Sequence, residues 1–135
     1  MTEHIADGDA LLRRVADQPN LWKRDGGGIV RPTSAAMKPH GADAGLCVDV
    51  RRLLADPADP TSVLASFPRH GLAEFTAEVP RSLGLRVHHA PLEENPAHAN
   101  VTGFDELTRA EAKRVQREIA LKSAWVRMPA TAEEG

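Results

Sequence analysis

Residues 71–84 read GLAEFTAEVPRSLG, and the conformation of this stretch decides the fold. One set of its apolar side chains has the spacing of a helix: Leu72, Phe75, Val79 and Leu83. A second set alternates as in a strand: Ala73, Phe75, Ala77 and Val79. Pro80 favours the strand, because a proline inside a helix loses a donor and clashes with the preceding turn, at a cost of about 3 kcal/mol. We therefore predict a strand that ends near Val79, followed by a turn at residues 80–82.

Segments on both sides of this stretch also have strand patterns. The sequence LCVDV at 46–50 alternates apolar and other residues, as expected of a half-buried strand. Residues 85–88 (LRVH) predict a second strand, and residues 97–101 (AHANV) predict a third after the turn ENP. The sequence DGGG at 25–28 supplies the residues of a tight turn, which indicates a hairpin flanked by residues 21–22 and 29–31.

Helices are predicted at both ends of the chain. Residues 7–16 place Leu11, Leu12 and Val15 on one helical face, and TRAE at 108–111 has the pattern of a capping box for a helix that should run to about Trp125. Short helical turns are expected at residues 34–37, 51–54 and 60–67. The predicted architecture is α+β: a small, mostly antiparallel sheet covered by N- and C-terminal helices. Residues 1–135 should form a single domain, with 1–6 and 129–135 flexible.

Composition narrows the class of protein. The 135 residues are 41% hydrophobic and 27% charged, which suits one globular domain. Cys47 is the single cysteine and no apolar run reaches the roughly 18 to 20 residues of a membrane span, so we expect a cytoplasmic protein. A net charge of −2 and 4% aromatic residues argue against nucleic-acid binding, and the excess of arginine over lysine suggests a bacterial source.

His98 is the leading candidate for chemistry. The turn at Asn95-Pro96 precedes it, and small alanines flank it on the predicted strand, which leaves space around the imidazole. It could act as a general base if Glu93, Glu94 or Asp49 orients its other nitrogen. No metal site is predicted, because the central histidines match no metal-binding motif: His70, His88, His89 and His98.

Two other combinations of residues match the residue types of known catalytic sites but also have simpler structural roles. Cys47, Asp49 and His98 are the residue types of a thiol triad, although a cysteine in the middle of a strand is usually a packing residue. Arg31 and Ser34, with Glu74 or Glu78, are types found in NAD-consuming transferases, but they are common enough to be structural. The glycines of the hairpin have no following lysine and serine or threonine, so they form a turn rather than a phosphate loop.

Three runs resemble segments of small bacterial proteins with no established activity. They are RPTSAAM at 31–37, LCVD at 46–49 and NPAHANV at 95–101. This resemblance implies a bacterial protein and implies no activity.

The sequence therefore supports two functions. The first is an accessory or binding domain that acts through a protein partner or a small ligand, recognised by the loop at residues 32–45 and the turn at residues 93–98. Its ligand-binding residues are predicted to be Asn95, Asp49 and Glu74. The alternative is a small enzyme that uses acid/base chemistry on a polar metabolite, in a pocket that contains His98, Arg31 and Ser34. No cofactor and no oligomeric state are indicated.

Overall fold

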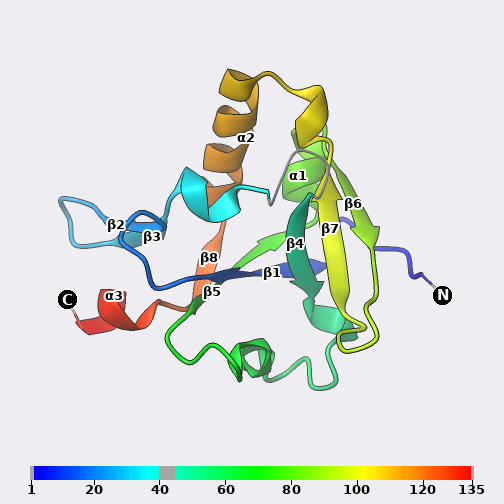
Figure 1. Cartoon of the computed structure of the whole chain (residues 1–135), viewed down its shortest axis with the longest axis horizontal. Helices are drawn as coiled ribbons and strands as arrows, with labels where there is room; N and C mark the ends of the chain where they lie inside the picture. Colours follow the sequence, from blue (N-terminus) through cyan, green and yellow to red (C-terminus); the bar gives the residue numbers. More distant parts are fainter. Residues whose placement is uncertain (1, 40–44, 135) are drawn as a thin grey trace.

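The computed structural model describes residues 2–39 and 45–134, and its centre is a six-stranded sheet in which all neighbouring strands are antiparallel (Figure 1). The strand order is β6-β7-β4-β1-β5-β8. The strands span Ala10–Val15 (β1), Leu46–Val50 (β4), Gly71–Thr76 (β5), Arg86–His89 (β6), His98–Thr102 (β7) and Ala124–Arg127 (β8). The predicted hairpin is a separate pair, β2 (Trp22–Arg24) and β3 (Val30–Pro32). The α+β class and the antiparallel sheet are confirmed.

Helices of the described residues connect and cover these strands. They are α1 (Glu78–Ser82), α2 (Arg109–Leu121), α3 (Ala130–Glu134) and the short 3-10 helices η1 (Ser34–Met37), η2 (Arg51–Leu53), η3 (Pro60–Leu64) and η4 (Phe104–Glu106). The predicted capping box begins α2: the Glu111 N–H donates to Thr108 Oγ1 at 3.1 Å, and the Thr108 N–H donates to Glu111 Oε1 at 2.9 Å. These two bonds satisfy backbone donors that the first turn leaves unpaired.

The pairing of β1 with β4 is short, and it shapes the molecule. β1 pairs with β5 along its whole length but pairs with β4 only through Leu11↔Val50 and Leu12↔Asp49. Figure 1 shows β1 and β5 running across the direction of β4 and β7. The second half of β1 therefore separates from the first half of β4, and an opening is left between them.

The two faces of the sheet are covered unequally. The main core contains side chains such as Leu11 and Val15 of β1, together with Met37 of η1 and Ile119 of α2. The opposite face has a smaller cluster, in which the buried residues are Leu12, Leu64 and Leu72. Because η3 covers only this small cluster, side chains next to it on the second face are open to a ligand.

The N-terminal element differs from the prediction. Residues 10–15 form β1 and not part of a helix, so the described residues contain no N-terminal covering helix. The sequence ALLRRV satisfies both patterns, and pairing with strands on both sides decides between them. Asp9, which precedes β1, accepts a hydrogen bond at Oδ2 from the Ala6 N–H at 2.8 Å.

The strand before Pro80 ends as predicted, but it ends earlier, and Pro80 lies in the first turn of a short helix. β5 ends at Thr76, three residues before the predicted end at Val79, and Pro80 is the third residue of α1. A proline is tolerated in the first turn of a helix because the N–H that it lacks would have no partner within the helix. The predicted turn at residues 80–82 is thus the greater part of a short helix.

The C-terminal helix is shorter than predicted. α2 ends at Leu121, and Trp125 lies in β8, where it pairs with Ala73 of β5 and donates from Nε1 to the Val30 carbonyl at 3.0 Å. Residues 130–134 form α3 instead of an irregular tail, and Ala132 is buried. The helix that covers the main core is therefore internal to the chain, and the expected covering by a C-terminal helix is not confirmed.

Candidate ligand-binding groove

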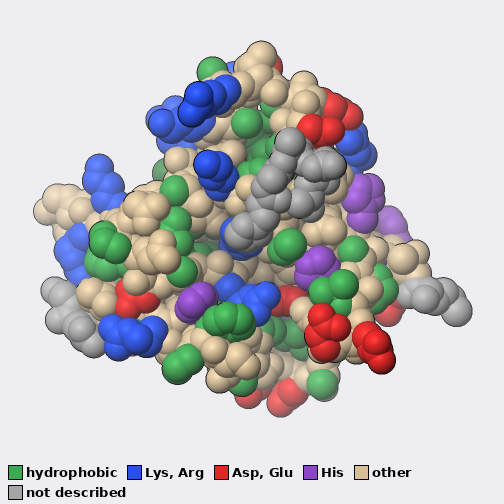
Figure 2. Space-filling view, viewed as in Figure 1, with side chains coloured by type: hydrophobic (Ala, Val, Ile, Leu, Met, Phe, Trp, Pro, Cys, Tyr) green, Lys and Arg blue, Asp and Glu red, His purple; other side chains and the backbone are tan. Residues whose placement is uncertain are grey.

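A groove crosses the second face of the sheet and enters the opening between β1 and β4, where residues of η1 border it. It consists of two adjoining cavities of about 680 and 610 Å³. Both are lined by the same five residues, which makes them parts of one space: Arg14, Cys47, Asp49, Phe67 and His98. Figure 2 shows basic and histidine side chains, in blue and purple, around a hollow near the middle of this face.

Strand alternation places these residues together. In β4, Leu46, Val48 and Val50 enter the main core, so Cys47 and Asp49 face the groove. The β4–β7 register sets Asp49 directly opposite His98. In β1, Arg14 follows Leu12 by two residues and so lies on the same face as Leu12.

Arg13 connects β1 to η1 and to β4 at the point where the two strands separate. Its Nε donates to the Ala36 carbonyl of η1 at 3.0 Å, and its Nη1 donates to the Cys47 carbonyl of β4 at 3.1 Å. Burial lowers the pKa of Arg13, and the charge of Arg14 acts in the same direction, but a guanidinium remains charged at neutral pH. Arg13 therefore holds the first cavity open and brings a positive charge to its wall.

Arg14 brings a second positive charge to the groove. Its Cζ lies 4.8 Å from the centre of the Phe67 ring, which is a cation–π contact. No residue among 2–39 and 45–134 forms a hydrogen bond or an ion pair with its guanidinium. The Phe67 ring thus packs against the flat side of the Arg14 guanidinium. The N–H groups of this guanidinium remain available to donate to a ligand.

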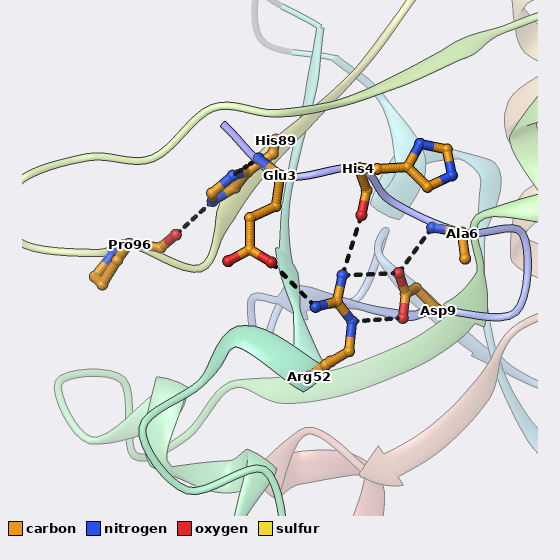
Figure 3. A network of polar contacts seen from close by, with 7 residues as sticks. All are labelled: Glu3, His4, Ala6, Asp9, Arg52, His89 and Pro96. Carbon is orange, nitrogen blue, oxygen red and sulfur yellow. Dashed lines mark hydrogen bonds and ion pairs between the residues drawn. The ribbon is translucent and has the colours of Figure 1, made fainter. Parts of the chain in front are cut away.

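A network at the N-terminal segment holds the turn that carries the other wall of the groove (Figure 3). The Glu3 N–H donates to His89 Nδ1 at 2.8 Å, so this nitrogen has no proton and His89 Nε2 donates to the Pro96 carbonyl at 2.7 Å. Arg52 fixes the same segment through the Asp9 carboxylate at 3.0 Å and the His4 carbonyl at 3.1 Å. His89 is thus a structural residue.

The turn positions two side chains in the groove wall. Asn95 Nδ2 donates to Asp49 Oδ1 at 2.6 Å, and Asp49 is only 3% exposed. His98 Nδ1 lies 2.9 Å from the Ala90 carbonyl oxygen. A carbonyl can only accept, so Nδ1 carries the proton, and Nε2 of the neutral ring is a hydrogen-bond acceptor.

His70 lines the first cavity next to Phe67, with 4.8 Å between the ring centres. Burial lowers its pKa below 6.5, and the charges of Arg14 and Arg127 add to this effect against the opposing charge of Asp17. The folded protein therefore favours the neutral ring.

This lowered pKa predicts a loss of stability in weak acid. Below pH 6.5 the unfolded chain binds a proton at His70 more readily than the folded chain does, so the free energy of unfolding should fall between pH 7 and pH 5. Urea unfolding at both pH values measures the change. His70→Gln should reduce it, whereas His4→Gln, at an exposed position, should not. An equal change in wild type and His70→Gln would contradict the prediction.

The sequence-predicted site residues fall into two groups. Asp49, Asn95 and His98 come together in the groove. Cys47 lines the same space, so the residue types of a thiol triad do meet on one face. Glu74 lies on β5 and lines neither cavity. Its Oε2 accepts a hydrogen bond from Arg51 Nη1 at 2.8 Å.

Arg31 and Ser34 do not line either cavity. Arg31 lies on β3 with its side chain 53% exposed, 3.7 Å from the Asp25 carboxylate, and Ser34 begins η1. Other parts of the predicted contact surface do border the groove: residues 35, 36, 38 and 39 line the first cavity, and residues 94–98 line the second. Residues 40–44 of the predicted loop lie outside the described residues.

Sequence reasoning missed the two arginines that give the groove its charge. The helix predicted for residues 7–16 has Leu11, Leu12 and Val15 on its apolar face, and this pattern gives no reason to select Arg13 or Arg14. As part of a strand, ALLRRV sends Arg13 to the side of Leu11 and Val15, and Arg14 to the opposite side. Two adjacent arginines inside an apolar strand were the signal that could have identified them.

Neither comparison with known proteins nor the arrangement of possible metal ligands identifies a family or a cofactor for this chain. Comparison with protein-family models, with curated proteins and with solved structures found no match to this chain. Among the described residues, no three or more histidine, cysteine, aspartate or glutamate side chains are arranged to hold a metal ion. No helix in that part of the chain has the length and apolar character needed to cross a membrane.

Proposed function

We propose that this chain is a binding domain that acts through a small ligand, which it holds in the groove by an anionic group at Arg14. The observation that carries the proposal is the position of this guanidinium, supported by Phe67 and without a polar partner among the described residues. Arg13 and Lys38 line the same cavity, and Asp49 is the only carboxylate among the described residues that line it, so the ionised side chains of this described wall are predominantly positive. Such a wall favours an anion.

The form of the groove supports a small ligand over a protein partner. Each cavity has a volume within the range of roughly 300 to 1,000 Å³ that is usual for small-molecule sites. Apolar side chains such as Leu12, Leu21 and Phe67 line the first cavity beside the charged groups. A few convergent polar groups in a largely apolar wall are typical of ligand sites. A cytoplasmic bacterial protein that senses or carries a metabolite fits this description.

Removal of the Arg14 charge tests the proposal. Wild-type protein should be stabilised in thermal melts by millimolar small carboxylates or inorganic phosphate, because a ligand that binds only the folded state shifts the unfolding equilibrium. Arg14→Gln should weaken binding measured by titration calorimetry at least about tenfold, which is the effect of losing one charge-assisted hydrogen bond.

Arg117→Gln is the matched control, since Arg117 is exposed on α2 and away from the groove residues. It should bind anions as the wild type does. The proposal fails if no anion stabilises the protein, or if Arg14→Gln binds as tightly as Arg117→Gln.

The alternative function is an enzyme in which His98 is the general base on a polar metabolite. The observation that favours it is the hydrogen bond to Ala90, which engages Nδ1 and leaves Nε2 as the ring nitrogen that can accept a proton in the wall of the groove. Arg14 would then orient the substrate, and it takes the place in the pocket beside His98 that the sequence predicted for Arg31 and Ser34. This alternative requires that a bound ligand is converted, so nuclear magnetic resonance spectra of the ligand that stay unchanged over hours with the protein would oppose it.

A further inference from the structure

The groove contains both signs of charge in positions that do not neutralise each other. Arg14 and Asp49 line both cavities, yet no ion pair joins them among the described residues. Asp49 is opposite Leu12 in the sheet, and Arg14 follows Leu12 by two residues. In a regular pair of strands, positions offset in this way are about 7–8 Å apart, and the separation of β1 from β4 after Leu12 increases this distance. A ligand that lies between them can meet a cation at one end and a carboxylate at the other.

The acceptors near Asp49 define the second group of the ligand. Asn95 occupies Asp49 Oδ1, and Oδ2 has no hydrogen-bond partner among the described residues. His98 is the residue opposite Asp49, and its Nε2 is also an acceptor. Two adjacent acceptors, one of them a carboxylate, match a group that is positively charged and has several N–H donors. A primary ammonium, with three donors, is such a group.

The second cavity provides space for an apolar side chain. Beyond the shared polar residues it is lined mainly by apolar groups: Leu53, Leu54, Ala55, Val63, Leu92 and Pro96. Burial of apolar surface there would add to affinity at roughly 25 cal/mol per Å². From these three subsites we infer that the ligand of the groove is a free α-amino acid with an apolar side chain, with its carboxylate at Arg14 and its ammonium at Asp49 and His98. This inference rests on the proposed function and specifies its ligand class.

Three probes with the same branched apolar side chain separate the subsites. L-leucine carries both charges, 4-methylpentanoate lacks the ammonium, and 3-methylbutylamine lacks the carboxylate. Titration calorimetry at pH 7.5 should show that L-leucine binds at least about tenfold more tightly than 4-methylpentanoate, the difference expected from charge-assisted hydrogen bonds to Asp49. 3-Methylbutylamine should bind most weakly, because it has no carboxylate to accept hydrogen bonds from the Arg14 guanidinium. A thermal-shift screen of the twenty amino acids extends the comparison to other side chains.

Substitutions in the groove test which residues bind the ammonium and which bind the carboxylate of the amino acid. Asp49→Asn can still accept from Asn95, and it should reduce the preference for L-leucine over 4-methylpentanoate to less than about threefold, since the carboxylate charge is lost. His98→Gln is a second variant on the same side and should reduce this preference as well. Glu93→Gln is the control, because Glu93 is on the same turn and lines neither cavity. Arg14→Gln should weaken both ligands.

The outcomes distinguish this inference from the proposed function. If 4-methylpentanoate or inorganic phosphate binds as tightly as the best amino acid, the amino-acid inference is overturned and the anion-binding function stands. If Asp49→Asn and His98→Gln both keep the full preference for L-leucine, the assigned ammonium subsite is wrong. If neither the twenty amino acids nor the simple anions bind, both proposals fall.

Discussion

Ile119→Ala should lower the free energy of unfolding by about 2–5 kcal/mol, the usual cost of removing a large aliphatic side chain from a core. Ile119 is fully buried on the inner side of α2, in the cluster that joins this helix to η1 and to the sheet. Alanine has a higher helix propensity than isoleucine, so the loss would come from packing and not from the helix itself. Urea unfolding followed by circular dichroism measures it.

Leu121→Ala on the same helix is the matched control. Leu121 is 54% exposed, so the same kind of truncation should change the free energy of unfolding by no more than about 0.5 kcal/mol. Equal losses for the two variants would show that the helix does not cover the core through the face described here.

The strands and the capped helix were readable from the sequence because local signals and tertiary contacts agree there. The alternation at residues 46–50 matches the true inside and outside of β4, and the capping box begins α2 at the predicted residue. Residues 10–15 show where this agreement ends. Their pattern fits a helix or a strand, and the choice is made by β4 and β5, which are distant in the sequence.

The same error concealed part of the candidate site. Asp49, Asn95 and His98 could be selected from the sequence because polar residues at strand ends and turns are common in ligand sites. A helix over residues 7–16 gives no reason to select Arg14. The prediction that joins Arg31 and Ser34 to His98 rests on residue type alone, and residue type does not specify distance. Tertiary pairing, and not chemistry, was the missing information.

Arg13→Met should lower the free energy of unfolding by about 2–3 kcal/mol, because it removes two hydrogen bonds from a charged donor and leaves two carbonyl acceptors without their partner. Methionine keeps an unbranched apolar stem of similar reach, so the loss reports mainly on the polar contacts. Water that enters the cavity can reach these carbonyls, which limits the loss to this range. Urea unfolding followed by tryptophan fluorescence measures it.

Arg14→Met is the comparison variant for Arg13→Met, because the two arginines are neighbours with different contacts. The two arginines are adjacent, but strand alternation gives Arg13 the carbonyls of η1 and β4, and gives Arg14 only the Phe67 ring among the described residues. Arg14→Met should therefore cost less than about 1 kcal/mol of stability, the size of an exposed cation–π contact, and yet abolish anion binding. Arg13→Met should show the larger loss of stability of the two. If Arg14→Met unfolds the protein as readily as Arg13→Met, the guanidinium of Arg14 is structural and is not free to bind a ligand.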